Sequence, residues 1–182
     1  MEIKNEALKF LDPEEIVGQL EITPGSQIAD FGCGAGFFSV VLAQKTGPEG
    51  KVFSLDVVPQ ALEATMGRAE SLGLRNIVIK RVNLEKESGS TLEAGSLDWV
   101  ILKDILFQNK NKKIILQEVF RVLKAGGRVL IVEWNDDFQG IGPALDLRIK
   151  KLQLKEMAEM ENLNFEKEIG AGKFHYAGVF KK

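Results

Sequence analysis

Two residue types that build metal and redox sites are nearly missing from this sequence of 182 residues, which has one cysteine, Cys33, and one histidine, His175. A disulfide within the chain is therefore excluded, and thiolate or multi-histidine zinc sites lack ligands. No apolar run approaches the roughly 18 residues that cross a bilayer. Residues 1–10 lack the basic and then apolar layout of a secretory signal. We expect a cytoplasmic protein with no bound metal and no membrane span.

The sequence also lacks an excess of positive charge, since 24 lysines and arginines face 26 aspartates and glutamates, for a net charge of −2. A strongly basic face is therefore not expected, which argues against a nucleic-acid partner. The length suits one domain with a sizeable core. We expect a single domain over residues 1–182, with residues 1–22 as a helical cap, in a monomer or a homodimer.

Short apolar runs alternate with segments of helical periodicity, which is the pattern of a parallel sheet covered by helices. The predicted strands are residues 27–31, 51–57, 76–83, 97–104 and 128–134, and the predicted helices begin near residues 13, 36, 59, 112 and 152. Asp12 is the expected N-cap of the first helix, and residues 125–127 are the expected turn into the fifth strand. A hairpin over residues 165–182 adds two strands. The predicted fold class is α/β, a doubly wound, Rossmann-like, seven-stranded sheet that is mostly parallel with an antiparallel last strand.

In such a sheet the ligand lies beyond the carboxyl ends of the parallel strands, where the strand order reverses. That rule selects the residues that end the predicted strands, which are residues 30–36, Asp56, Asn83, Asp104, and Glu133 with Trp134. The last strand runs the other way, so its beginning lies on the ligand side. Residues 174–176, with His175 among them, are therefore expected on the same rim but at the far side of the sheet.

A glycine-rich turn, with Gly32, Gly34 and Gly36 at alternating positions, follows the first strand. Glycines let the backbone turn sharply and approach a ligand closely, and the helix N-terminus that follows favours a carboxylate. The dinucleotide fingerprint G-x-G-x-x-G is not met, because Phe37 occupies its third glycine position. Asp30, two residues before the first glycine, suits a cationic group. A carboxylate and an ammonium together describe the amino-acid end of S-adenosylmethionine better than a pyrophosphate.

Two more strand ends complete a nucleoside site. Asp56 stands 20 residues after Gly36, and an ionised carboxylate there can accept hydrogen bonds from both ribose hydroxyls. Asn83 offers an amide that both donates and accepts, which matches the edge of adenine, and the backbone N–H of Leu84 can serve equally. A plain turn residue remains an open interpretation of Asn83.

Four segments carry a family resemblance, namely IADFGCGAGFFS, VFSLDVVPQAL, SLDWVILKDIL and EVFRVLKAGGRVLIVEW. In this order and spacing, over most of residues 10–134, the chain resembles the class I (seven-stranded) S-adenosylmethionine-dependent methyltransferases. Within them it is similar to the small enzymes related to ubiquinone and menaquinone biosynthesis. The tail FHYAGVFKK resembles the last strand of that family.

The resemblance implies a role for each matching position. It implies that the methionine moiety is held by Asp30, Gly32, Gly34 and Gly36, the ribose by Asp56, the adenine by Val57, Asn83 and Leu84, and that Lys103 and Asp104 form the wall near the sulfonium methyl. Two departures matter. Asn83 stands where relatives often have aspartate, and LFQNK follows the fourth strand where relatives often have a histidine.

Methyl transfer from a sulfonium depends mostly on positioning, and a general base is needed only when the nucleophile enters protonated. If there is a base, we expect Asp104 or His175 to supply it, because Asp104 ends a strand beside the methyl and an imidazole titrates near neutrality. Asp104 as a helix cap and His175 as an ordinary strand residue are the structural alternatives. Cys33 is expected to be a small buried filler.

The leading function is methylation of a small molecule with S-adenosylmethionine as cofactor. Three alternatives stay open: a protein of this fold that binds the cofactor without turnover, a methyltransferase acting on RNA or protein, and a nicotinamide-dependent oxidoreductase. The sequence offers no aromatic and basic surface for RNA, and KDIL follows the fourth strand where a methyltransferase of RNA or protein would have an Asn-Pro-Pro-Tyr type of segment. The glycine spacing disfavours a nicotinamide-dependent oxidoreductase.

Overall fold

The computed structural model describes residues 11–137 and 140–182. Part of the expected cap, residues 1–10, lies outside the described residues. The helices are α1 (Pro13–Gly18), α2 (Phe37–Thr46), α3 (Pro59–Ser71), α4 (Lys112–Val122) and α5 (Lys151–Met160), with a 3₁₀ turn η1 (Leu145–Leu147). The strands are β1 (Gln27–Phe31), β2 (Lys51–Asp56), β3 (Ile77–Arg81), β4 (Leu97–Lys103), β5 (Leu123–Trp134), β6 (Asn164–Ile169) and β7 (His175–Lys181).

The seven strands form one sheet in the order β3-β2-β1-β4-β5-β7-β6. Strands β1 to β5 pair in parallel, whereas β7 runs antiparallel to both β5 and β6. The chain moves outward from β1 to β3 and then crosses back to β4, so the order reverses between β1 and β4. The predicted fold class is confirmed, and the reversal point is where a ligand site is expected.

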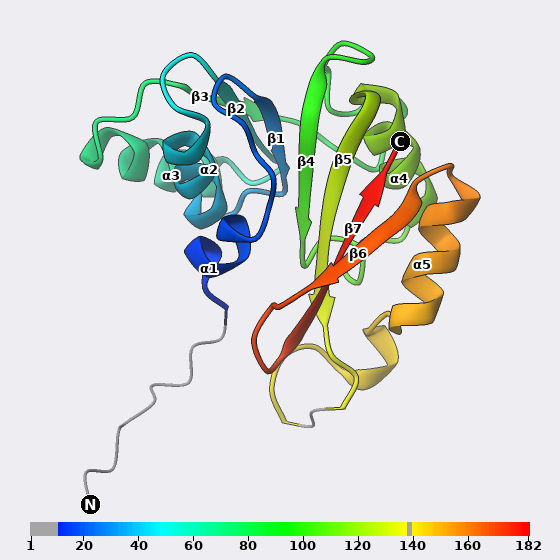
Figure 1. Ribbon diagram of the computed structural model, residues 1–182. Helices are drawn as coiled ribbons and strands as arrows, with labels where there is room; N and C mark the ends of the chain where they lie inside the picture. The colour runs from blue at the N-terminus through cyan, green and yellow to red at the C-terminus, as the bar shows by residue number, and fades with distance from the viewer. Residues whose placement is uncertain (1–10, 138–139) are drawn as a thin grey trace, which may run out of the picture.

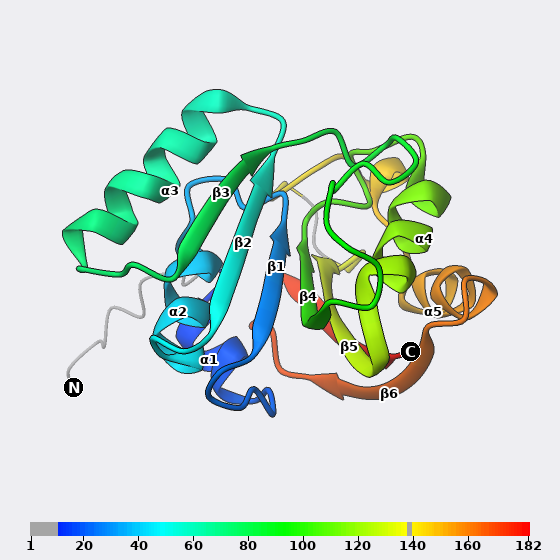
Figure 2. The same ribbon diagram turned by 90° about the horizontal axis from the view of Figure 1, so that it is seen from above.

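Helices cover both faces of the sheet (Figures 1 and 2). The strands alternate their side chains between the two faces, so there are two cores. In β4, Trp99 and Ile101 join the core beneath α1, α2 and α3, while Val100 and Leu102 join the core beneath α4 and α5. These buried strands read as nearly continuous apolar runs, as strands covered on both faces do. The carboxyl ends of β1 and β4 are thereby held side by side on a rigid base.

The first helix begins as predicted. Asp12 accepts hydrogen bonds from the backbone N–H groups of Glu14 and Glu15, and Pro13 occupies the first turn, where its missing N–H costs nothing. Among the described residues no helix is both long and apolar enough to span a bilayer.

The start of β5 differs from the prediction. The helix ends at Val122, and Leu123 is already extended and pairs with Leu97, so β5 begins five residues before the expected Arg128. The expected turn is present as an irregularity in the strand, where Gly126 has a φ of +77°. Leu123 is completely buried, and its pairing with Leu97 extends the sheet to a residue before the glycines.

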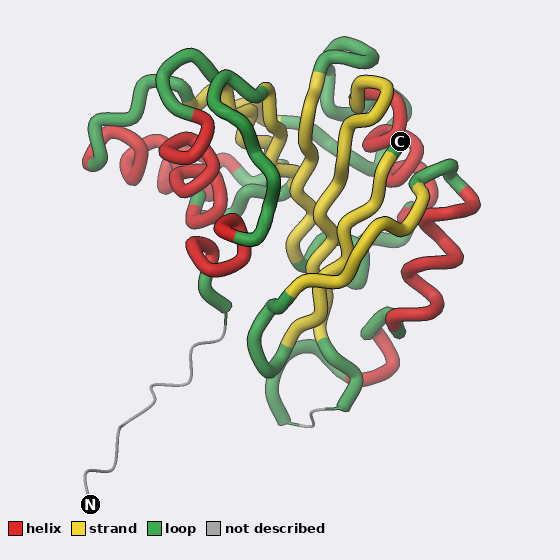
Figure 3. Tube along the Cα trace, viewed as in Figure 1, coloured by secondary structure: helices red, strands yellow, loops and turns green. Residues whose placement is uncertain are grey.

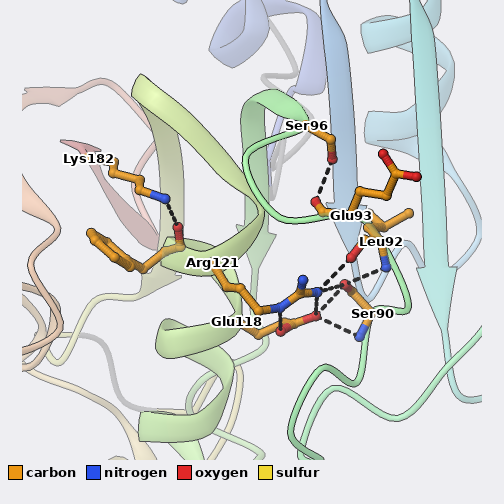
Figure 4. Close-up of polar contacts among 8 residues, drawn as sticks. Ser90, Leu92, Glu93, Ser96, Glu118, Arg121 and Lys182 are labelled. Atoms are coloured by element: carbon orange, nitrogen blue, oxygen red, sulfur yellow. Dashed lines mark hydrogen bonds and ion pairs between the residues drawn. The ribbon is translucent and has the colours of Figure 1, made fainter.

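A buried ionic network holds the segment between β3 and β4, which carries no regular structure (Figures 3 and 4). Glu118 of α4 accepts hydrogen bonds from Arg121, from the backbone of Ser90 and from its hydroxyl, and Arg121 donates to the carbonyl of Leu92 at 2.7 Å. Burial disfavours the charge of Glu118, but the hydrogen bonds of Arg121 and Ser90 outweigh it and lower the pKa of Glu118. The network fixes the segment that begins at the end of β3.

Candidate functional site

A cavity of about 820 Å³ opens at the carboxyl ends of β1, β2, β3 and β4, at the reversal point of the sheet. The predicted site residues that line it are Asp30, Gly32, Gly34, Asp56, Val57, Asn83, Leu84, Lys103 and Asp104. Gly36 and His175 do not line it. Leu11 and Pro13, at the start of α1, also line the cavity, so the described part of the expected cap reaches it.

The turn after β1 takes its shape from glycines that no other residue replaces easily. The N–H groups of Gly32 and Cys33 both donate to the carbonyl of Leu55, which ties the turn to β2. Gly32 has a φ of +77°, and an added Cβ would lie 2.0 Å from Cδ1 of Ile105. Gly34 has a φ of +52°, but a Cβ there would meet open space. The two glycines therefore serve close packing and backbone conformation, respectively.

Gly36 has a packing role that the sequence interpretation did not assign. It is the N-cap of α2 with a φ of +78°, and a Cβ on it would lie 2.7–2.9 Å from atoms of Thr65 in α3. The missing side chain lets the N-terminus of α2 approach the middle of α3 closely. Gly36 itself does not line the cavity, although its neighbours Ala35 and Phe37 do, so its predicted contact with a ligand stays a prediction.

Asp30 is buried at the floor of the cavity, with 2% of its surface exposed. The hydroxyl of Ser39 donates to Oδ2 of Asp30 at 2.6 Å, and Ser54 donates to Ser39 at 2.7 Å. Burial raises the pKa of Asp30 to about 6, against the hydrogen bond of Ser39, which lowers it. A carboxyl in this setting gains its charge most readily beside a cationic group.

Asp56 ends β2 and faces the turn after β1. Its Oδ2 accepts from the N–H of Gly34 and its Oδ1 from the N–H of Val58, both at 2.9 Å. Each carboxylate oxygen keeps acceptor capacity beyond these bonds. The carboxylate is therefore locked in place with room for two further donors, as a pair of vicinal hydroxyls provides. Val57, beside it, is 55% exposed and presents an apolar surface to the cavity.

Asn83 acts first as a turn residue. Its side-chain oxygen accepts from the N–H of Glu85 at 2.9 Å, and its carbonyl accepts from Lys86. The two interpretations of this residue are compatible, because Asn83 also lines the cavity beside Leu84 and its amide nitrogen remains a donor.

Cys33 is a buried free thiol, and burial raises its pKa to about 12, which keeps it protonated.

The far wall of the cavity is charged. Lys103, which ends β4, forms an ion pair with Asp104, the residue that follows it. Asp104 has a φ of +57°, which is uncommon for a residue with a side chain. No helix begins there, since α4 starts at Lys112, so the helix-cap interpretation of Asp104 is wrong.

His175 lies closer to Asp104 than the sequence predicts. Strand β7 is inserted between β5 and β6, which places His175 opposite Trp134 of β5 rather than at the far side of the sheet. The Nε2 atom of His175 lies 3.4 Å from Oδ1 of Asp104, and its ring lies 4.2 Å from the ring of Trp134. The two candidate bases are therefore neighbours, with Asp104 on the cavity and His175 behind it.

Glu133 is a buried acid to which the sequence interpretation gave no role, although the strand-end rule selected its position. Its Oε1 accepts from the N–H of Leu106 at 2.8 Å, which fixes the turn that follows Asp104. The pKa of Glu133 is raised to about 8, mainly by burial and secondly by the nearby charge of Asp104.

Within residues 11–137 and 140–182, no group of three or more His, Cys, Asp or Glu side chains is placed to hold a metal.

Two curated methyltransferases are similar to more than half of this chain. A demethylmenaquinone methyltransferase of Lactococcus lactis is 34% identical over 109 residues, which make up 60% of this chain and 42% of that protein. An arsenite methyltransferase of Aquipseudomonas alcaligenes is 29% identical over 109 residues, which make up 58% of this chain and 32% of that protein. The chain thus spans less than half the length of these two curated relatives.

A solved structure shares the fold over nearly the whole chain. A SAM-dependent methyltransferase from Aquifex aeolicus has a TM-score of 0.86 at 21% identity, covering 96% of this chain and 91% of that one. The sequence pattern of a methyltransferase domain family matches residues 22–178. The resemblance inferred from the four segments is thus confirmed, and the chain belongs to this methyltransferase domain family.

Proposed function

We propose that the chain transfers a methyl group from S-adenosylmethionine to a small-molecule acceptor. The observation that carries the proposal is that one cavity gathers Asp30, the turn at Gly32 and Gly34, Asp56 and Asn83 from three different strand ends. Its volume of about 820 Å³ lies within the range of small-molecule sites, roughly 300–1,000 Å³.

The residues present fit this cofactor. A buried acid, Asp30, stands ready for the ammonium group, and Asp56 is held by backbone N–H groups with acceptor capacity left for the ribose hydroxyls. Val57 offers an apolar surface for the face of the adenine ring. Asn83 and the backbone of Leu84 offer hydrogen-bond partners for the edge of that ring. The acid Asp30 beside the glycine turn disfavours a pyrophosphate there, whose charge it would repel.

The cofactor supplies an already activated methyl group, so the protein contributes binding, orientation and a dry site. Lys103 and Asp104 form the wall where we place the acceptor, and Leu11 and Pro13 of the cap also line the cavity. The part of residues 1–22 that the structure describes supports a cap role within a single domain. Activity by positioning alone requires no further side chain.

A small molecule is the acceptor class that we favour. The similar proteins of Lactococcus lactis and Aquipseudomonas alcaligenes bear names that specify a menaquinone precursor and arsenite. The single cysteine, buried and protonated, does not suit the several thiols of arsenic chemistry. The net charge of −2 argues against a nucleic-acid acceptor, and we place the chain in the cytoplasm as a monomer or a homodimer.

Thermal shift measurements with S-adenosylmethionine, S-adenosylhomocysteine and NAD, each added separately, test the proposal. A ligand at 100 times its Kd adds about 2.7 kcal/mol of stability. We expect both sulfur ligands to stabilise the wild type and the Asp98→Asn control, and to stabilise Asp56→Asn much less. Asp98 pairs with Lys124 at the opposite end of β4 from Lys103 and does not line the cavity.

Stabilisation by NAD alone would overturn the proposal and favour an oxidoreductase. Binding of the sulfur ligands with no methyl transfer in a screen of metabolite pools with labelled cofactor would favour a binding protein without turnover. A screen in which only RNA or protein becomes labelled would replace the small-molecule acceptor.

A further inference from the structure

Four buried side-chain atoms in the described part of the chain have no hydrogen-bond partner, and they belong to three residues at one place. They are Oδ1 of Asp104, Oε2 of Glu133 and both ring nitrogens of His175. A buried polar atom without a partner has lost its hydrogen bonds to water without replacing them, so such atoms are rare in folded proteins and call for an explanation. Three titratable groups with unused hydrogen-bonding capacity at one rim of the sheet indicate a functional cluster.

The three residues come from three neighbouring strands. Asp104 follows β4, Glu133 lies near the end of β5, and His175 begins β7 opposite Trp134. His175 is 3% exposed and its Nε2 lies 3.4 Å from Oδ1 of Asp104, while Glu133 is completely buried. Catalytic hydrogen bonds are often long or poorly aligned before a substrate binds, so a contact of 3.4 Å suits a pair that closes on binding.

Only Asp104 of the three residues lines the cavity, and the other two stand behind it. Glu133 holds the turn after Asp104 through the N–H of Leu106, and His175 approaches the oxygen of Asp104 that is not paired with Lys103. The backbone of Asp104 is left-handed, a conformation that persists where its surroundings impose it. Asp104 is thus the member of the cluster that a ligand in the cavity would contact, while Glu133 holds the turn after it and His175 lies behind it.

Other charged and titratable groups act on members of the cluster or on the residues beside them. Lys103 pairs with Asp104, and Lys112 of α4 acts on Glu133. Glu133 and Asp136 act on Tyr176 of β7, and the guanidinium of Arg148 lies 5.8 Å from the ring centroid of Trp134. Lys112 favours the charged form of Glu133, whereas burial and the charge of Asp104 oppose it. The cluster therefore joins a buried acid to the pair of Asp104 and His175 at the edge of the cavity.

We propose that Asp104, Glu133 and His175 form a proton-accepting site, and that the methyl acceptor is therefore a nucleophile that enters with its proton, such as a hydroxyl group. The proposal rests on the proposed function and adds to it the class of substrate. The acceptor's O–H bond breaks as its O–CH₃ bond forms, and the proton moves to Asp104 and is shared with His175. The electron pair of the broken C–S bond stays on sulfur, which loses its positive charge.

The single histidine makes this site directly observable. With ¹⁵N-labelled histidine in the full chain, long-range ¹H–¹⁵N spectra recorded from pH 5 to pH 9 report one imidazole, that of His175. We expect Asp104→Asn and Glu133→Gln each to change the pH dependence of the imidazole signals. The matched control is Asp98→Asn, which removes an aspartate that is likewise paired with a lysine, at the other end of β4. It should leave the signals unchanged.

Unchanged imidazole signals in both variants would overturn the shared proton site. A response to only one variant would contradict a site made of all three residues. Backbone amide spectra establish that each variant is folded. Calorimetry with S-adenosylhomocysteine runs alongside, because failure of the wild type to bind it would overturn the proposed function whatever the histidine does.

The substrate class is tested by the labelled-cofactor screen described above. With a hydroxyl acceptor, Asp104→Asn should lower kcat by about 100-fold or more, and Asp98→Asn should not. His175→Gln should change the pH profile of kcat rather than the binding of S-adenosylhomocysteine. Methylation of a nucleophile that carries no proton, such as a tertiary amine or a thioether, would overturn the proposal.

Discussion

Replacement of Glu133 by glutamine should change how the stability of the protein depends on pH. Glu133 is completely buried, and its pKa is raised from the ordinary 4.5 to about 8, first by burial and then by the charge of Asp104. The folded state therefore binds a proton more tightly than the unfolded state, so Glu133 costs stability as the pH rises from 4.5 through 8. Glutamine has a similar shape, keeps an oxygen for the N–H of Leu106, and carries no titrating proton.

The magnitude follows from the difference between the two pKa values. A shift from 4.5 to about 8 is 3.5 pH units, which at 1.36 kcal/mol per unit is at most roughly 5 kcal/mol. We therefore expect the wild type to lose several kcal/mol relative to Glu133→Gln between pH 5 and pH 9. Other titrating groups are common to both proteins and cancel in the difference.

Urea denaturation of both proteins at a series of pH values measures this difference. Glu168→Gln is a suitable control, because Glu168 is half exposed and pairs with Lys151 at the surface. Curves for the wild type and Glu133→Gln that stay parallel from pH 5 to pH 9 would refute the reasoning, since they would mean that Glu133 has the same proton affinity in both states.

Three further predictions concern the glycine turn, the buried network and the floor of the cavity. In urea denaturation, Gly36→Ala should cost clearly more than Gly34→Ala, whose left-handed backbone alone costs about 1–2 kcal/mol; equal costs would contradict the packing role of Gly36. Glu118→Ala should cost about 3–5 kcal/mol and Glu166→Ala, in a surface pair, less than about 1 kcal/mol; similar losses would contradict the buried network. Calorimetry should find S-adenosylmethionine binding about 10-fold tighter at pH 7 than at pH 5, because the pKa of Asp30 is about 6. Retention of that dependence in Asp30→Asn would assign it to another group.

Much of the fold could be predicted from the sequence because its signals are local. Asp12 with Pro13 marks a helix start, glycines follow the ends of α2 and α3, and apolar runs mark the strands. The acids of the candidate site were found because strand ends converge on one edge of a parallel sheet. The family resemblance added the expected role of each position.

The remaining features depend on contacts between distant segments. The role of Gly36 depends on Thr65, which lies in another helix, and the early start of β5 depends on the pairing of Leu123 with Leu97. The meeting of His175 with Asp104 depends on the insertion of β7 between β5 and β6, for which the sequence has no local signal.

The central claim is that S-adenosylmethionine occupies the cavity at the reversal point of the sheet. A crystal structure of the chain with S-adenosylhomocysteine tests it most directly. We predict the ribose hydroxyls within hydrogen-bond distance of Asp56, the amino-acid end at the turn beside Asp30, and the sulfur toward Asp104. A ligand bound elsewhere, or one bound with its adenine at Asp104, would contradict the account.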